Sequence, residues 1–126
     1  MSYSSLIVDD SAIIRKMIRR ALSLSGLDLG DILEAGDGRQ ALAVLDDHWV
    51  DVVLTDIHMP EMDGIELVER MALDPLLSKI PVLVVSTERS EERIERLRRL
   101  GIKGYLTKPF TPEQIRDAVT RALGGD

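Results

Sequence analysis

The stretch "DVVLTDIHMPEMDG" (residues 51–64) places a carboxylate, Asp56, directly after an apolar run. A charge that is buried without a partner is costly, so such a group neutralises or finds a partner. The run before Asp56 is apolar on consecutive residues, which is typical of a strand covered on both faces, as in a parallel sheet. We therefore expect Asp56 at the end of a buried strand, either as a surface capping residue or as part of a charged site.

The rest of the chain alternates short apolar runs with segments of helical spacing. The apolar runs are 5–8, 31–35, 51–55, 80–86 and 104–107, and the helical segments are 12–25, 38–47, 64–73, 90–100 and 111–123. Five successive β-α units predict an α/β fold, with a five-stranded parallel sheet, right-handed crossovers and helices on both faces. The second and fifth runs are short and mixed, so we expect them at the edges of the sheet.

Sequence signals also mark the ends and faces of several helices. Thr111 is expected to cap the last helix, with Pro112 at its first position and Gln114 at the capping-box position. Ser90 is the expected cap of the fourth helix, and Asp63 of the third. In the first helix, the spacing places four apolar residues near one face and the basic residues mostly outside; the four are Ile13, Met17, Leu22 and Leu24.

Length and composition limit the class of protein. A chain of 126 residues suits one domain, 1–126. It contains no cysteine, which excludes disulfides and thiolate metal sites. No apolar stretch approaches the roughly 18 residues that a membrane span needs, and "MSYSSLIVDD" (1–10) does not resemble a signal peptide. We expect a cytoplasmic protein without membrane insertion.

The charge pattern argues against nucleic acid as a partner. The net charge is −6, and the four aromatic residues (one Trp, two Tyr and one Phe) offer little for base stacking. The one basic concentration is "RSEERIERLRR" (89–99), in which Arg alternates with Glu at helical spacings. This alternation favours a solvated, salt-bridged helix over a nucleic-acid patch.

Polar residues follow four of the predicted strands. The first runs into Asp9 and Asp10, the third into Asp56, the fourth into Ser86, and the fifth into Lys108. In parallel sheets, functional residues gather at the carboxyl ends of strands. Three neighbouring carboxylates repel one another unless a cation lies among them, and oxygen-only ligands indicate Mg²⁺ or Mn²⁺. The sequence therefore predicts a divalent-cation site at this edge.

The same set of groups suits the chemistry of an acyl phosphate. A carboxylate beside a divalent cation, a lysine and a hydroxyl can attack phosphorus. The cation and Lys108 would offset the charge on the phosphoryl group during transfer. A simple Mg²⁺ store has no need of Lys108 or Ser86.

Four ordered motifs at four successive strand ends carry a family resemblance. They are "VDDS" (8–11), "DIHMPEMDG" (56–64), "VVST" (84–87) and "KPF" (108–110). In this order and spacing they resemble the CheY-like receiver domain of two-component response regulators, over residues 6–123. The resemblance implies the flavodoxin-like doubly wound sheet with strand order 2-1-3-4-5, an order taken from the family.

The resemblance implies roles at the phosphorylation site. Asp56 would be the phosphoacceptor, taking its phosphoryl group from a phosphohistidine on a sensor histidine kinase or phosphotransfer protein. Asp9 and Asp10 would hold Mg²⁺, with Asp56 and the backbone carbonyl of His58 as the remaining protein ligands. Lys108 would pair with the phosphoryl group.

The resemblance also implies roles around this site. Ser86 and Tyr105 would be the switch residues, one contacting the phosphoryl group and the other changing rotamer. The side chain of His58 and that of Glu88 would tune hydrolysis of the acyl phosphate. The peptide bond before Pro109 resembles one that is cis in such domains.

These features together predict a single-domain response regulator, which catalyses only its own phosphorylation and dephosphorylation. Phosphorylation would switch protein binding on the surface formed by the fourth helix, fifth strand and fifth helix (residues 89–123). The energy would come from the different contacts that the phosphoryl group makes in two pre-existing states. The expected downstream target is a motor switch, a kinase or another effector, in chemotaxis or a phosphorelay.

Three alternatives stay open at this point. A phosphate sink would be phosphorylated in the same way but would have no output of its own. A small haloacid-dehalogenase-like phosphatase would show Asp-x-Asp, whereas this chain reads Asp56-Ile57-His58. A flavodoxin-type flavin module would need a phosphate loop after the first strand, where "DDSAII" (9–14) is too acidic.

Overall fold

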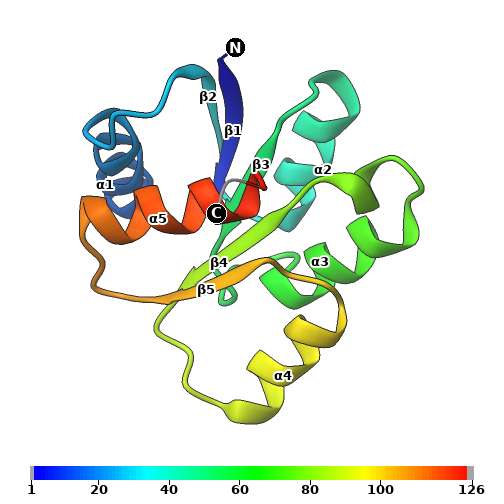
Figure 1. Ribbon diagram of the computed structural model, residues 1–126. Helices are drawn as coiled ribbons and strands as arrows, with labels where there is room; N and C mark the ends of the chain where they lie inside the picture. Colours follow the sequence, from blue (N-terminus) through cyan, green and yellow to red (C-terminus); the bar gives the residue numbers. More distant parts are fainter. Residues whose placement is uncertain (1, 125–126) are drawn as a thin grey trace.

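Five parallel strands form the centre of the molecule in the computed structural model, which describes residues 2–124 (Figure 1). Their order is β2-β1-β3-β4-β5, and every neighbouring pair is parallel. This confirms the order implied by the family, with the second and fifth strands at the edges. The strands are β1 (Tyr3–Val8), β2 (Leu29–Ala35), β3 (Val52–Thr55), β4 (Val82–Ser86) and β5 (Gly104–Thr107).

A helix follows each strand, as the sequence predicts. The helices are α1 (Ala12–Ser23), α2 (Gly38–Asp47), α3 (Gly64–Leu73), α4 (Glu91–Arg99) and α5 (Pro112–Ala122), with a short 3₁₀ helix η1 (Leu77–Lys79) before β4. Asp63, Ser90 and Thr111 each accept a backbone N–H as helix caps. The capping box between Thr111 and Gln114 is present, so these predictions are confirmed.

The two faces of the sheet carry separate apolar cores. Along β1, Leu6 packs into the core under α2, α3 and α4, while Ile7 packs into the core under α1 and α5. Figure 1 shows these two groups of helices on opposite sides of the sheet. Because side chains alternate along a strand, burial on both faces requires consecutive apolar residues. That requirement explains the apolar run that precedes Asp56.

The prediction for the face of α1 was wrong. Ile13 and Met17 are 73% and 50% exposed, whereas Ile18 and Ala21 are buried with Leu22. The buried stripe of the helix therefore lies to one side of the stripe that the apolar spacing indicated. Basic residues define the remaining face, where Arg15 Nε and Arg19 Nη2 pair with Glu34 of β2 at 2.9 and 2.8 Å.

Helix α4 is attached to the core by few apolar contacts. Leu97 is its one buried residue, whereas α3 buries Leu67, Val68 and Met71. Two ion pairs, Arg93 with Glu88 and Arg96 with Glu69, also join α4 to other parts of the molecule. None of the helices in the described part of the chain is long and apolar enough to cross a membrane.

Candidate functional site

The registers of the strands bring the predicted site residues to one edge of the sheet. Val8 of β1 pairs with Thr55 of β3, and Thr55 pairs with Val84 of β4. On the far side, Ser86 of β4 pairs with Thr107 of β5. The polar residues that follow these positions therefore lie beside one another, as the sequence predicts.

Lys108 connects two of the predicted carboxylates. Its Nζ donates to Asp9 Oδ2 at 2.9 Å and to Asp56 Oδ2 at 3.0 Å. The side chains of Lys108, Asp9 and Asp56 are only 14%, 2% and 11% exposed. Burial lowers the pKa of Lys108, but hydrogen bonds to the two carboxylates and their charge outweigh it and raise that pKa above its ordinary value. The peptide bond from Lys108 to Pro109 is cis, as expected.

Asp10 adds a third carboxylate to this pair. Asp9, Asp10 and Asp56 each offer an oxygen, and these oxygens all lie within 4.8 Å of one another. Burial raises the pKa of Asp9, even though Lys108 and the backbone N–H of Ser11 act to lower it. Three carboxylates and one ammonium leave excess negative charge, and an all-oxygen set of this kind suits a hard divalent cation. The residues present therefore fit Mg²⁺.

The backbone around Asp56 is fixed by hydrogen bonds and by a close helix. Asp56 Oδ1 accepts the N–H of Ile57 at 2.7 Å, and the Asp56 N–H donates to the carbonyl of Val8 at 2.9 Å. Gly64, the first residue of α3, donates its N–H to the carbonyl of Ile57 at 2.8 Å. A Cβ on Gly64 would lie 2.1 Å from the carbonyl oxygen of Asp56, so only glycine fits there. The sequence showed Gly64 as the start of a helix, but it gave no sign of this contact.

The predicted switch residues lie on the neighbouring strands. Ser86 is fully buried at the end of β4, and its Oγ accepts the N–H of Glu88 at 3.1 Å. The Tyr105 hydroxyl donates to the backbone carbonyl of Glu88 at 2.6 Å. Burial raises the pKa of Tyr105, which keeps its hydroxyl protonated as a donor. Glu88 is therefore bound through its backbone to both switch residues.

The two residues expected to tune hydrolysis contact each other. His58 Nε2 lies 3.3 Å from Glu88 Oε1, across the loops that follow β3 and β4. Arg93 of α4 approaches the same oxygen at 2.8 Å. Arg93 belongs to the predicted output surface, and in the structure it also forms an ion pair with Glu88. A metal-ligand role for the backbone carbonyl of His58 stays a prediction.

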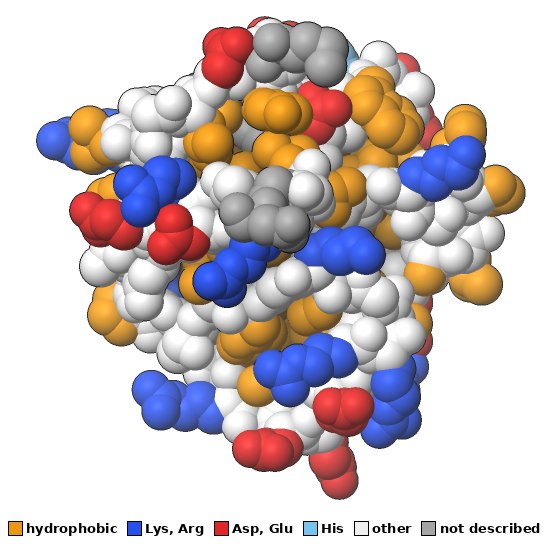
Figure 2. All heavy atoms as spheres, in the orientation of Figure 1, with side chains coloured by type: hydrophobic (Ala, Val, Ile, Leu, Met, Phe, Trp, Pro, Cys, Tyr) orange, Lys and Arg blue, Asp and Glu red, His pale blue; other side chains and the backbone are white. Residues whose placement is uncertain are grey.

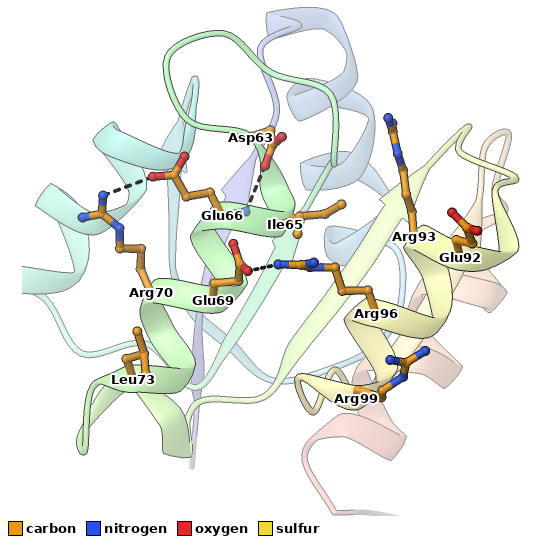
Figure 3. Close-up of a pocket in the computed structure, with 10 residues that line it drawn as sticks. All are labelled: Asp63, Ile65, Glu66, Glu69, Arg70, Leu73, Glu92, Arg93, Arg96 and Arg99. Carbon is orange, nitrogen blue, oxygen red and sulfur yellow. Dashed lines mark hydrogen bonds and ion pairs between the residues drawn. The ribbon is translucent and has the colours of Figure 1, made fainter.

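A large groove on the surface lies away from these carboxylates. It is an open groove of about 1040 Å³ between α3 and α4 (Figure 3). Its walls carry both signs of charge, and an ion pair between Arg96 and Glu69 crosses it. Figure 2 shows acidic and basic side chains intermixed around α4, at the bottom of the view. The predicted solvated, salt-bridged character of α4 is confirmed.

Removal of the Lys108 ammonium is expected to destabilise the fold, because the carboxylates of Asp9 and Asp56 then repel each other. Lys108→Met leaves two buried carboxylates without their shared cation, which costs about 3 kcal/mol of unfolding free energy. Mg²⁺ should restore part of that stability by binding the same carboxylates. Urea unfolding with and without Mg²⁺ measures both effects. Lys103→Met, at an exposed lysine, is the control; equal stability of the two variants would contradict the expectation.

Comparison with known proteins agrees with this fold. The profile of the response regulator receiver domain matches residues 5–120. The chain therefore belongs to the response regulator receiver domain family. It is 35% identical over 120 residues to the chemotaxis protein CheY1 of Helicobacter pylori, covering 94% of this chain and 95% of that protein. It is 36% identical over 118 residues to CheY of Pseudomonas aeruginosa, covering 92% of each chain.

Solved structures show the same relationship. The chemotaxis response regulator CheY4 of Vibrio cholerae superposes with a TM-score of 0.86 at 34% sequence identity. The match covers 98% of this chain and all of that one. The five-stranded flavodoxin-like fold is thus shared with CheY structures, and the chain is a CheY-like response regulator receiver domain.

Proposed function

We propose that this receiver domain is a phosphorylation switch in which Asp56 accepts a phosphoryl group. The donor would be a phosphohistidine on a sensor histidine kinase or a phosphotransfer protein. One observation carries the proposal: the Asp56 carboxylate is hydrogen-bonded to Lys108 and lies beside the carboxylates of Asp9 and Asp10. A carboxylate beside an ammonium and a site for a divalent cation can act as a nucleophile toward phosphorus.

The site residues divide the work of the transfer. Asp9, Asp10 and Asp56, with the backbone carbonyl of His58, would hold Mg²⁺ (or Mn²⁺), which when bound neutralises charge on the phosphoryl group. An Asp56 oxygen attacks phosphorus as the P–N bond to the donor histidine breaks. The electron pair of that bond stays on the histidine nitrogen, which takes up a proton. Lys108 pairs with a phosphoryl oxygen and orients it.

Ser86 and Tyr105 would report the phosphoryl group to the surface. The Ser86 oxygen accepts the Glu88 N–H, and its O–H would be the group that donates to a phosphoryl oxygen. A move of Ser86 toward that oxygen disturbs the backbone of Glu88, to which the Tyr105 hydroxyl is bonded. Two states that differ in these contacts are populated differently with and without phosphate.

The output is proposed to be protein binding on the surface formed by α4, β5 and α5, within a single receiver domain. Several curated relatives carry names of chemotaxis proteins, which supports a chemotaxis pathway with a motor switch, kinase or other effector as target. Hydrolysis would be tuned by His58 and Glu88. The cytoplasmic location expected from the sequence stays a prediction.

Phosphorylation by acetyl phosphate tests the phosphoacceptor directly. The proposed site predicts that this phosphorylation requires a divalent metal ion. With Mg²⁺ present, intact-mass spectrometry should show one phosphoryl group per chain. EDTA should remove most of this uptake, because the excess negative charge at the site then repels the incoming phosphoryl group. Uptake that is the same in EDTA and in Mg²⁺ would refute the proposed site.

The acyl-phosphate mimic beryllofluoride separates a switch from a phosphate sink. NMR spectra of the free and mimic-bound protein should differ at Ser86, at Tyr105 and along α4. Pull-downs with the two forms should then retain different amounts of the target. Changes confined to the immediate surroundings of Asp56 would instead support a sink.

A further inference from the structure

The carboxylate of Glu88 joins two loops to helix α4. Its Oε1 lies 3.3 Å from His58 Nε2 and 2.8 Å from Arg93 Nη1. Its Oε2 accepts the backbone N–H groups of Arg89 and Ser90 at 3.0 and 3.2 Å. The Glu88 side chain is 14% exposed, whereas those of His58 and Arg93 are both 54% exposed. Glu88 is therefore the sheltered centre of a polar bridge, which we name the His58–Glu88–Arg93 bridge.

This bridge joins two loops that begin at the site. His58 is two residues after Asp56, and Glu88 is two residues after Ser86. The two side chains therefore connect the loop that carries Asp56 with the loop that follows Ser86. The backbone N–H of Ser90, and then Arg93, hold the pKa of Glu88 below its ordinary value, so Glu88 is an anion at neutral pH.

Arg93 pairs with Glu88 and takes no part in the ion pair that crosses the groove. Another arginine of the groove, Arg96, pairs with Glu69 of α3 across the groove. In Figure 3 the side chain of Arg93 points away from that pair. Leu97 is the one buried residue of α4, and the ion pair between Arg93 and Glu88 joins the first turns of this helix to the loop that follows β4.

We propose that Arg93 is a positioning residue that lengthens the life of the phosphoryl group on Asp56. It holds the Glu88 carboxylate against His58, and the two joined side chains restrict the approach of water. In the hydrolysis that they slow, a water oxygen bonds to phosphorus while the bond from phosphorus to the Asp56 oxygen breaks. Asp56 leaves as a carboxylate, and the released phosphate keeps the protons of the water.

The inference rests on the proposed function, and its effect is expected to be modest. Without Arg93, one side of the Glu88 carboxylate is held by His58 alone, and the pair opens more often. The loss of an ion pair between partly exposed groups corresponds to a change of about two- to fivefold in rate. Arg93→Gln should therefore lose its phosphoryl group about two to five times faster than the parent.

The test measures the decay of the phosphorylated protein after acetyl phosphate is removed, with Mg²⁺ present. Arg93→Gln is compared with Arg93→Lys, which keeps the charge, and with Arg98→Gln. Arg98 is an exposed arginine of the same helix that has no ion pair among residues 2–124. Arg93→Gln should accelerate decay, Arg93→Lys should recover most of the parent lifetime, and Arg98→Gln should match the parent.

The Glu88→Ala background decides whether Arg93 acts through Glu88. In that background Arg93→Gln should change nothing further, because the group that Arg93 positions is gone. An unchanged or slower decay in Arg93→Gln alone would overturn the inference, as would the same acceleration in both backgrounds. If the parent itself takes up no phosphoryl group in the first step, the proposed function fails, and that outcome is distinct from the loss of the inference alone.

Discussion

Asp56→Asn is expected to abolish phosphoryl uptake from acetyl phosphate, with a loss of at least about a hundredfold. A carboxamide lacks the anionic oxygen that attacks phosphorus and cannot form the mixed anhydride. The variant should nevertheless fold, because Lys108 keeps its ion pair with Asp9 at 2.9 Å and one source of repulsion is removed. Intact-mass spectrometry in Mg²⁺ measures the uptake, and thermal unfolding checks the fold.

Asp63→Asn is the matched control for this loss. Asp63 lies in the same loop, seven residues after Asp56, and its Oδ1 accepts the N–H of Glu66 at 2.9 Å as the cap of α3. Asparagine caps helices about as well as aspartate. This variant should therefore fold and accept a phosphoryl group like the parent. Stoichiometric uptake by Asp56→Asn would show that another residue is the acceptor.

Gly64→Ala is expected to have the largest effect on stability among the substitutions considered. The added Cβ would lie 2.1 Å from the carbonyl oxygen of Asp56 and 2.8 Å from Cα of Ile57. Both are backbone atoms, so no side-chain rotation relieves the contact. Moving the start of α3 away from the β3 end should cost about 3 kcal/mol or more of unfolding free energy. It should also displace Asp56 and reduce phosphoryl uptake.

Gly36→Ala provides a control at another glycine. The three atoms nearest to its added Cβ all belong to the Gln40 side chain, the first at 3.2 Å, and a flexible side chain can move. Urea unfolding should therefore show a small change for Gly36→Ala and a large one for Gly64→Ala. Similar unfolding midpoints for the two variants would mean that the close approach of α3 to Asp56 is not needed.

The strands and helices could be predicted from the sequence because their signals are local. β3 is buried at every position, and its run of consecutive apolar residues reflects cover on both faces. The start of α5 could be predicted from helix-capping residues alone, namely Thr111, Pro112 and Gln114. The order of the strands required the family, because pairing between distant segments leaves no local pattern. The face of α1 was mispredicted because both its exposed and its buried stripes contain apolar residues.

The site could be predicted as far as the topology determines it. Asp9, Asp56 and Lys108 come together because parallel strands deliver their carboxyl ends to one edge of the sheet. The contact of Gly64 with the Asp56 carbonyl depends instead on how closely a helix approaches a strand. The contact of Arg93 with Glu88 likewise depends on the angle at which α4 leaves its loop. Neither relation has a signature in residue spacing.

The position of the phosphoryl group is the most direct test of the central claim. The parent protein is treated with acetyl phosphate and Mg²⁺, its acyl phosphate is trapped by reduction with borohydride, and peptides are sequenced by mass spectrometry. The account predicts that the trapped residue is Asp56 alone. Reduction at Asp9 instead, or a phosphoryl group found on Ser86 or His58, would contradict it.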